Sequence, residues 1–413
     1  MKKKILILGA GFAGIRCAQD LVKKLSPETA EITLVERNPY HLFHPDLYEI
    51  ATAFNEEITK KCLSKLSDAI SIPLKDLIDG RRVKLIQNEI ISIDPAARKV
   101  GLKGKILKYD YLLVALGSET NYFGIPGMEK YSFPMKNLPD ALKINCHLDQ
   151  FFHSLYSKGR TGGDVHINIG GGGATGVEAA AELVGSLKRL CEKYHYPFER
   201  VHLSLIEGGD SLAALNRTGT KVVTRRLNQL GVKIYFNHYI GKVEKKSLYF
   251  KGEGAIPSDV LIWTGGVMVN KLVQKFLGTS KLRGAIEVNH FLQSKSDPRI
   301  FAAGDNAFYS KQAGMFAQVA YKQGACVADN LVSLVKGKGA LRPFKFEHEH
   351  YLLPLGGTYA IWRFRGRIFS GTWVWALRRL VFFRYALTIL PLRKSLVKLF
   401  KGTKIFVQND IEN

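Results

Sequence analysis

Apolar and polar residues follow the same order twice along this chain. A continuous apolar run leads into a glycine-rich turn, then into a segment that we predict to be helical, and then into a second apolar run that ends in a glutamate. The apolar runs are 4–8 and 31–35 in the first copy and 165–169 and 201–206 in the second, and the predicted helices reach about Lys24 and Lys193. Short apolar runs between turn signals are typical of buried strands. The pattern therefore predicts two α/β units, whose separation of 162 residues is too long for a solenoid repeat.

Three later segments extend this plan. Residues 111–117 and 260–266 are apolar runs that end in small residues, and we expect each to close one of the two sheets. Residues 300–305 form a strand-to-turn element that we expect to return the chain to the first sheet. The expected domains are 1–120 together with 290–355, the inserted segment 121–289, and a C-terminal region 356–413.

The composition is that of a globular protein with two or three domains, since 46% of the 413 residues are hydrophobic and 23% are charged. The five cysteines have no spacing typical of a zinc or iron–sulfur site, so we expect no metal and a reducing compartment. The apolar run that follows Lys4 is too short for a signal sequence. No uninterrupted apolar stretch reaches the roughly 18 residues of a membrane-spanning helix. Any membrane contact is therefore expected to be peripheral.

The two glycine-rich turns are the main candidates for ligand binding. They read Gly9-Ala10-Gly11-Phe12-Ala13-Gly14 and Gly171-Gly172-Gly173-Ala174-Thr175-Gly176. A dinucleotide pyrophosphate needs backbone N–H donors at a helix N-terminus and no side chains in its way. The alternative, a turn required only for folding, would have to explain the same strand–turn–helix context twice. The sequence therefore predicts an α/β protein with two Rossmann-like dinucleotide-binding domains, the second inserted in the first.

A carboxylate follows each turn at the end of the next strand. Glu36 lies 22 residues after Gly14, the usual distance for a carboxylate that binds a ribose diol, and Glu207 lies 31 residues after Gly176. Because a carboxylate repels a 2′-phosphate, Glu207 favours NADH over NADPH. For both glutamates, a solvated strand end is the alternative.

These residues resemble the two-dinucleotide flavin reductases of the pyridine nucleotide-disulfide reductase-like fold, and most closely the type II NADH:quinone oxidoreductases. The resemblance covers nearly the whole chain. It implies that the first turn binds FAD and that Ala303-Gly304-Asp305 is the second flavin motif. The segment from His41 to Glu49 resembles the stretch beside the flavin. The FAD residues that the resemblance implies are Gly9, Gly11, Phe12, Ala13, Gly14, Glu36, Arg37, Ala115, Gly117, Gly304, Asp305, Ala317 and Gln318.

The same resemblance assigns the second turn to NADH and implies where chemistry occurs. The NADH residues would be Gly171, Gly173, Thr175, Gly176, Glu178, Glu207, Gly265 and Gly266. Glu178 is expected to orient the nicotinamide or to handle a proton, although an acid in the first turn of a helix is also favoured by the helix dipole. The quinone pattern A-Q-x-A-x-Q of the family reads Ala317-Gln318-Val319-Ala320-Tyr321-Lys322 here. Gln318 and Lys322 are therefore candidate quinone residues, and an ordinary helix with a polar face is the alternative.

Residues 359–404 form a distinct basic and aromatic region, with eleven Lys or Arg residues and no acid. The chain as a whole carries a net charge of +24, and residues 1–358 account for only +15 of it. Pro391 is expected to split the region into two helices, of which the second is amphipathic. Tryptophans and phenylalanines interleaved with arginines are typical of a membrane surface, so we expect contact with anionic lipid. Packing against the protein and a homodimer contact are alternatives, whereas nucleic acid is not an expected partner.

The sequence thus predicts a peripheral enzyme on the cytoplasmic face of the cell membrane that carries FAD and passes electrons from NADH to a membrane quinone without pumping protons. A disulfide reductase is excluded because no cysteine pair is present, and a sulfide:quinone reductase is disfavoured because the cysteines are scattered. Two alternatives stay open: a soluble reductase of a small iron–sulfur protein, and a non-catalytic NADH sensor.

Overall fold

The computed structural model describes residues 2–411 except 57, 79, 81, 161, 253, 277–283, 310–315 and 346–350. In the C-terminal region 356–413, four charged groups lie outside what is described: Glu412 and the side chains of Arg379, Lys404 and Asp410.

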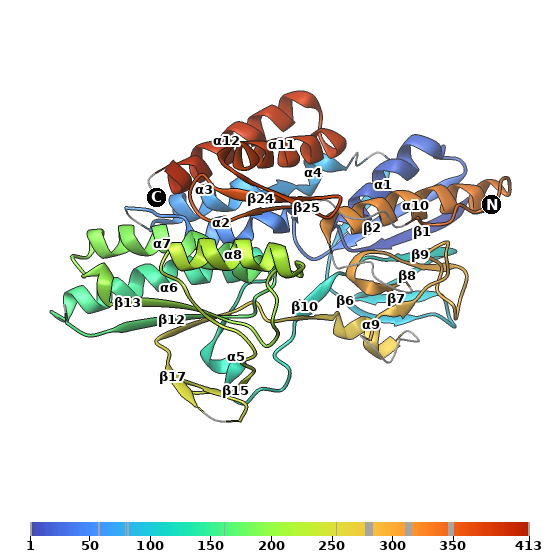
Figure 1. Ribbon diagram of the computed structural model, residues 1–413. Helices are drawn as coiled ribbons and strands as arrows, with labels where there is room; N and C mark the ends of the chain where they lie inside the picture. Colours follow the sequence, from blue (N-terminus) through green and yellow to red (C-terminus); the bar gives the residue numbers. More distant parts are fainter. Residues whose placement is uncertain are drawn as a thin grey trace.

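The first domain is built on a parallel sheet of five strands. Their order is β21 (Ile300–Ala302), β9 (Tyr111–Val114), β1 (Lys3–Leu8), β2 (Ala30–Glu36) and β5 (Val83–Gln87). Two helices, α1 (Phe12–Lys24) and α10 (Ala317–Lys336), lie side by side on this domain (Figure 1). An antiparallel meander of β6 (Ile90–Asp94), β7 (Lys99–Leu102) and β8 (Lys105–Lys108) shares the same hydrophobic core.

The second domain repeats this plan with a second parallel sheet of five strands. The order is β11 (Phe133–Pro134), β18 (Val260–Trp263), β12 (Val165–Gly170), β13 (Val201–Ile206) and β14 (Lys233–Tyr235). Its helices are α5 (Met128–Tyr131), α6 (Leu138–Ser157), α7 (Ala174–Lys193) and α8 (Arg217–Gln229). A small sheet of β15 (Ile240–Val243), β16 (Ser247–Phe250) and β17 (Ala255–Pro257) covers one end.

The strands and helices predicted around both glycine turns are confirmed. Helices α1 and α7 end at Lys24 and Lys193, as expected, and the predicted strands match β1, β2, β12 and β13 to within one residue. The runs 111–117 and 260–266 also form strands, although each strand stops before its small residues. The small residues that follow each strand no longer pair with the sheet, because glycine there favours a turn. This turn lies at the edge of the sheet where a nucleotide is expected.

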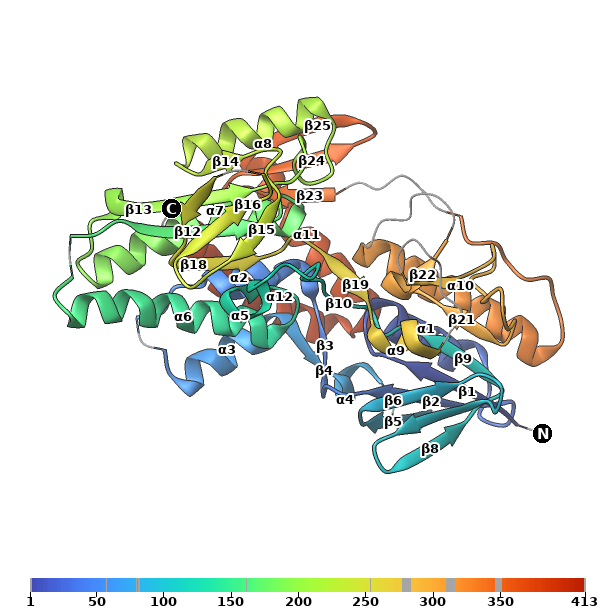
Figure 2. The same ribbon diagram turned by 90° about the horizontal axis from the view of Figure 1, so that it is seen from below.

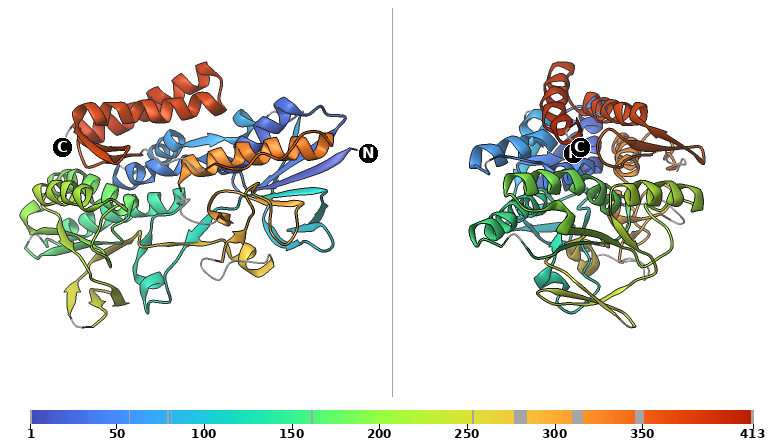
Figure 3. Two further views of the ribbon diagram at one scale, coloured as in Figure 1. Left: turned by 45° about the vertical axis from the view of Figure 1, so that its right-hand side comes forward. Right: turned by 60° about the vertical axis from the view of Figure 1, so that its left-hand side comes forward.

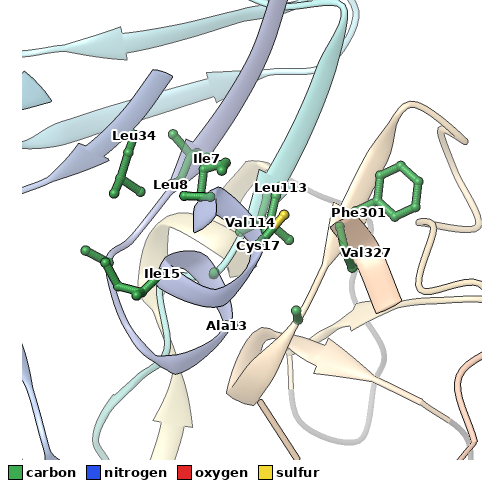
Figure 4. Packing of buried hydrophobic residues seen from close by; sticks show 14 of the residues in the cluster. Ile7, Leu8, Ala13, Ile15, Cys17, Leu34, Leu113, Val114, Phe301 and Val327 are labelled. Carbon is green, nitrogen blue, oxygen red and sulfur yellow. The ribbon is translucent and has the colours of Figure 1, made fainter. Parts of the chain in front are cut away.

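Close helix packing completes the first core. Gly324 of α10 lies against the backbone of Ala13 in α1, where a Cβ would be 2.9 Å from the Ala13 Cα. The absence of a side chain at Gly324 lets α10 approach α1, so that Val327 shares one buried cluster with Ile15 and Leu113 (Figure 4).

Two crossing strands connect the domains. Strand β10 (Ser118–Thr120) leaves the first domain and pairs in antiparallel fashion with β19 (Val267–Val269), which returns to it (Figure 2). From the last residue of β19 onward the chain packs in the first core, through Val269, Val273 and Ile286. The elements of this return are α9 (Lys271–Phe276) and β20 (Ile286–Glu287), which pairs with β22 (Ala307–Phe308). The sequence placed this return later, at residue 290, because the segment has no strong periodicity.

The segment between β2 and β5 packs against the second domain. It contains β3 (Tyr40–Leu42), which pairs with β4 (Ser71–Pro73), and the helices α2 (Leu47–Thr52), α3 (Lys60–Ile70) and α4 (Leu74–Leu77). Phe43 belongs to the first core, whereas Tyr48 and Ile50 are buried in the second. The stretch from His41 to Glu49 therefore lies at the junction of the two domains.

The C-terminal region begins with a sheet that the sequence did not predict. Strand β23 (Tyr351–Pro354) pairs with β24 (Ala360–Phe364), which pairs with β25 (Arg367–Gly371). The expected boundary at residue 356 falls inside this sheet, and Leu353 and Ile361 are buried in the second core. Two helices follow, α11 (Thr372–Ile389) and α12 (Leu392–Ile411), and their separation at Pro391 is confirmed.

Helices α11 and α12 lie side by side and form one outer layer of the molecule (Figure 3). Among the described residues, none of the helices combines the length and the apolar character that a membrane crossing requires.

We predict that Gly324→Val destabilises the first domain by about 1–3 kcal/mol, because the new side chain collides with the Ala13 backbone and forces α10 away from α1. Thermal unfolding of the purified protein measures the effect. Ala325→Val, at the half-exposed neighbouring position, is the control. An equal loss in both variants would mean that helix propensity, and not close packing, sets the cost.

Candidate functional site

The two glycine turns have the same geometry. Gly9 and Gly171 adopt φ values of +97° and +108°, which a residue with a Cβ adopts only under strain. Gly14 and Gly176 pack against the carbonyl oxygens of Gly9 and Gly171, so a side chain at either position would collide with the turn. The two turns thus bring each strand and helix together in the same way.

The middle glycine of each turn faces open space. A Cβ at Gly11 or at Gly173 would meet nothing within 4 Å. Gly11 and Gly173 are the N-caps of α1 and α7, and neither helix has a side-chain cap. Uncapped backbone N–H groups at a helix N-terminus attract an anion, so each turn offers an open cradle for a pyrophosphate.

Glu36 and Glu207 occupy equivalent positions. Glu36 accepts hydrogen bonds from the backbone N–H of Ala10 (2.8 Å) and of Asn38 (3.0 Å). Glu207 accepts from the N–H of Gly172 (2.6 Å) and of Gly209 (2.7 Å). Each carboxylate is therefore fixed beside its turn, with oxygen lone pairs left for a ribose diol.

The second flavin motif meets the end of β9. The buried side chain of Asn306 accepts from the Gly117 N–H (3.0 Å) and donates to the Gly117 carbonyl (2.7 Å). Asp305 accepts a short hydrogen bond from the Ser118 hydroxyl, which also accepts from Lys136 (2.8 Å). The structure thus brings the candidates Gly117, Gly304 and Asp305 together, with Ala115 buried two residues before Gly117.

Sequence reasoning missed three residues of this group: Asn306, Lys136 and Gln323. Gln323 is buried and its side-chain oxygen accepts from the Gly304 N–H at 2.7 Å. The only signal in the sequence was that Gln323 directly follows Lys322, the last position of the quinone pattern. Lys136 comes from the second domain, so no local pattern could have placed it here.

Other candidates have different surroundings from those expected. The ring of Phe12 is buried among His41, Phe43 and Tyr385, and Ala13 packs against Gly324, so neither side chain faces an open cradle. Arg37 is exposed. Gly265 packs against Gly171, and Gly266 lies beside Phe123. Thr175 is half-buried in the first turn of α7.

The quinone candidates lie at the start of α10. Ala317 is its first residue and is half-buried, whereas Gln318 and Lys322, one helical turn apart, are both exposed. They share an outer face of the helix, opposite the buried Gln323.

A buried cluster of charges joins the C-terminal helix to the domain junction. The Arg378 guanidinium of α11 lies 3.0 Å from an Asp46 carboxylate oxygen and 2.8 Å from Glu49, and it stacks over the Tyr48 ring at 5.2 Å. The side chains of Arg378 and Asp46 are 10% exposed and that of Glu49 is fully buried. Arg378 therefore packs against the protein, the alternative that the sequence left open for this region, because buried carboxylates compensate its charge.

Glu178 belongs to the same cluster. Burial raises the pKa of Glu178 well above its usual value, and the nearby Asp46 and Glu49 carboxylates add to the rise, while Arg378 opposes it. One guanidinium thus faces three acids. Glu178, which is half-buried, therefore retains its proton at pH values above the usual range of a glutamate.

A second polar chain ties α11 to the first glycine turn. The Nδ1 of His41 lies 2.8 Å from the Ala10 carbonyl, and its Nε2 lies 2.8 Å from the Tyr385 hydroxyl. Because a carbonyl only accepts, Nδ1 carries the hydrogen and Tyr385 donates to Nε2. Burial lowers the pKa of His41 to about 4, so the ring stays neutral and keeps this direction.

The residues present therefore fit two dinucleotides. Each site combines an open glycine turn, an uncapped helix N-terminus and a fixed carboxylate. The first site also has Asp305 beside it. This architecture defines a two-dinucleotide flavoprotein oxidoreductase. Residues 3–324 match the family model described as pyridine nucleotide-disulphide oxidoreductase, and the chain belongs to that family.

The comparison with individual proteins is more specific. The chain is 31% identical over 383 residues to the type II NADH:quinone oxidoreductase of Staphylococcus haemolyticus, covering 90% of this chain and 92% of the relative. It is 29% identical, over the same shares, to the enzyme of that name from Staphylococcus aureus (strain NCTC 8325). The chain is thus a member of the type II NADH:quinone oxidoreductase family.

Solved structures confirm the fold. NDH2 from Plasmodium falciparum in complex with NADH matches with a TM-score of 0.83 at 18% identity, covering 100% of both chains. The sulfide:quinone oxidoreductase of Aquifex aeolicus matches with a TM-score of 0.76 at 20% identity, covering 95% of this chain and 92% of that one.

We predict that Arg378→Met destabilises the docking of α11 by about 3 kcal/mol, because it leaves Asp46 and Glu49 buried without their cation. The melting temperature of the holoenzyme and the rate of proteolysis within residues 372–411 measure the loss. Arg384→Met, at an exposed position of the same helix, is the matched control and should change stability by less than about 0.5 kcal/mol. Equal effects of the two substitutions would contradict the role given to the buried pairs.

Proposed function

We propose that the protein is a peripheral membrane NADH:quinone oxidoreductase. Its first glycine turn binds FAD and its second binds NADH. The observation that carries this is the duplicated cradle, in which Glu36 and Glu207 bind equivalent backbone N–H groups. Bound FAD accepts a hydride from NADH and supplies two electrons to a quinone. The carboxylate of Glu207 accepts from the ribose hydroxyls of NADH and repels a 2′-phosphate.

The residues around the first turn hold the flavin dinucleotide in place. The N–H groups after Gly11 bind its phosphates, Glu36 binds the ribose, and Asp305 binds the ribityl chain. Lys136 of the second domain lies 3.8 Å from Asp305 and donates to Ser118. This contact fixes the second domain against the flavin motif, which is a condition for bringing nicotinamide and flavin together.

Quinone reduction requires a proton that NADH does not supply. NADH transfers two electrons and one proton as hydride, whereas a quinol carries two electrons and two protons more than its quinone. We propose that Glu178 holds the missing proton on its carboxyl group and that Asp46, Glu49 and Arg378 set its pKa. The sequence left open whether Glu178 orients nicotinamide or handles a proton, and its buried acidic surroundings support the second role.

Gln318 and Lys322 are proposed to contact the quinone. Both are exposed on one face of α10, near the start of the helix. Gln318 donates a hydrogen bond to a quinone carbonyl, and the Lys322 ammonium stabilises negative charge that develops on it.

The outer face of the C-terminal helices is proposed to bind the membrane. Trp373, Leu380 and Leu387 recur along α11 on the side away from Arg378, and their side chains are 54%, 58% and 42% exposed. On α12, Leu392, Val397 and Phe400 are exposed as well. Apolar and aromatic side chains on one face of a surface helix insert into the boundary between headgroups and acyl chains.

Basic residues surround this apolar face. Arg365, Arg367, Arg384, Arg393 and Lys401 are exposed, and Trp362 and Phe369 of the β24–β25 hairpin contact Trp373. Other basic residues of the region bind the protein instead, since Lys394 pairs with Asp76 and Lys398 donates to the carbonyls of Asp68 and Ser71. Fewer basic side chains are therefore available to bind lipid than the eleven that the sequence contains in residues 359–404. Five free cysteines and the use of NADH favour the cytoplasmic face.

We predict that the purified protein shows a flavin absorbance spectrum, that NADH bleaches it, and that a soluble quinone restores it with steady turnover. Glu178→Gln should lower kcat with quinone about a hundredfold because it removes the proton donor, while KM for NADH changes little. In the native enzyme, kcat should fall as pH rises through the raised pKa of Glu178, since the donor is then deprotonated; the variant should lack this fall.

Glu192→Gln is the matched control for this experiment, because Glu192 is an exposed glutamate on the same helix. Unchanged kcat and an unchanged pH profile in Glu178→Gln would exclude the proton role while leaving NADH:quinone turnover intact. Absence of turnover in the native protein would overturn the whole proposal.

A further prediction concerns lipid. Combined substitution of Trp373, Leu380 and Leu387 by Ser should weaken binding to vesicles of mixed zwitterionic and anionic phospholipid about a hundredfold or more, because each buried apolar side chain contributes about 1.5–3 kcal/mol. Co-flotation with vesicles measures binding. Ile91→Ser with Ile106→Ser removes two exposed apolar side chains of the meander and should leave binding unchanged. Full vesicle binding by the triple variant would contradict this orientation.

A further inference from the structure

Two histidines and an aspartate meet at the edge of the second sheet that is remote from its glycine turn. His166 and His202 are directly opposite each other in the parallel pairing of β12 with β13, and their rings are stacked with centroids 4.9 Å apart. The Nε2 of His202 lies 3.5 Å from a carboxylate oxygen of Asp164. One ligand atom from each of the three residues lies within 4.8 Å of the others.

The fold brings these residues together, since 36 positions separate His166 from His202 in the chain. Strands β12 and β13 are neighbours in the sheet, and partners in register place their side chains on the same face. Asp164 precedes β12 by one residue and so lies at the same edge. Metal sites are often built from side chains on neighbouring elements in this way. The spacing of the cysteines, on which the expectation of no metal rested, could not predict this cluster.

The charges around the cluster favour a cation. Asp164 supplies carboxylate oxygens beside the two rings, and each ring offers a nitrogen lone pair within reach of those oxygens. Asp259 accepts from the His166 backbone N–H at 2.9 Å and thereby fixes that strand residue. Arg200, whose guanidinium lies 3.9 Å from Asp164, is the one competing cation among the described groups in contact with the cluster.

We propose that Asp164, His166 and His202 form a surface site for a borderline divalent metal ion such as Zn²⁺. Imidazole nitrogens and one carboxylate oxygen are a donor set that Zn²⁺, Ni²⁺ and Cu²⁺ prefer over Mg²⁺ or Ca²⁺. Bonds of about 2.0 Å in a tetrahedral site require donor atoms about 3.3 Å apart. Side-chain rotations that move the donor atoms by roughly 1 Å bring them to this separation. His202 and Asp164 are exposed and free of main-chain constraint at their tips, so this closure needs no backbone movement.

A metal ion bound at this site links the start of β12 to the start of β13. His166 precedes Gly171 by five residues of extended chain, so the metal lies about 16 Å from the nucleotide turn. Occupancy therefore stabilises the second domain and leaves NADH oxidation unchanged.

Titration of the FAD-loaded holoenzyme with Zn²⁺, followed by calorimetry and by the melting temperature, tests this inference. Zn²⁺ should bind at one site per chain and raise the melting temperature. His166→Ala and His202→Ala should each weaken binding about tenfold or more, because each removes a ligand. His153→Ala, an exposed histidine on α6 outside the cluster, is the matched control and should bind Zn²⁺ as the native enzyme does.

Two further measurements distinguish this site from metal bound elsewhere. Arg200→Gln should tighten binding severalfold, because it removes the cation that competes for Asp164. Cu²⁺ substituted for Zn²⁺ should give an electron paramagnetic resonance spectrum with coupling to two imidazole nitrogens, reduced to one in His202→Ala. Equal Zn²⁺ affinity in the native enzyme, His166→Ala and His202→Ala, or a Cu²⁺ spectrum without imidazole coupling, would overturn the proposal.

Discussion

A buried guanidinium holds the functional centre of this enzyme together. Arg378 reaches from the C-terminal helix to Asp46 and Glu49 at the junction of the two domains, with Glu178 of the second domain in the same field. The contacts with Asp46 and Glu49 hold the Arg378 guanidinium in place, and removing it would leave these buried carboxylates without a compensating charge. The position of α11 and the protonation of Glu178 therefore depend on one another. The C-terminal helix and the junction of the two domains are thereby physically linked.

The duplicated cradle follows from a more local constraint. A turn that must pass within van der Waals distance of both a phosphate and its own helix leaves room only for glycine, and this requirement produced the same contacts at Gly14 and Gly176. Each adjoining glutamate then satisfies two backbone N–H groups that the turn leaves open. Each side chain thus stabilises its turn and keeps the lone pairs that we propose accept from a ribose.

The two sides of α11 differ in exposure: one packs against the protein, and the other is the side proposed to face lipid. Val374, Arg378, Tyr385 and Ile389 recur at helical spacing and face the protein, where Tyr385 binds His41 and the carbonyl of Ile389 accepts from Gln19. Trp373, Leu380 and Leu387 recur on the outer side. Since both sides are largely apolar, hydropathy alone does not distinguish them, and the polar atoms of Arg378 and Tyr385 decide which side turns inward.

Local sequence determined the features whose physics is local. Strand–turn–helix order, the glycines of both turns, the glutamates at the strand ends and the break at Pro391 are each set by neighbours within a few residues, and the fold contains all of them. The early return of the chain at β19 and the β23–β24–β25 sheet were not predicted, because their short strands gain stability only from cores built elsewhere. Tertiary structure alone decided that Arg378 is buried, that Gln323 and Asn306 support the flavin motif, and that His166 meets His202. Each of these contacts joins residues distant in the chain, and only the packing of complete domains fixes which charges and lone pairs face each other.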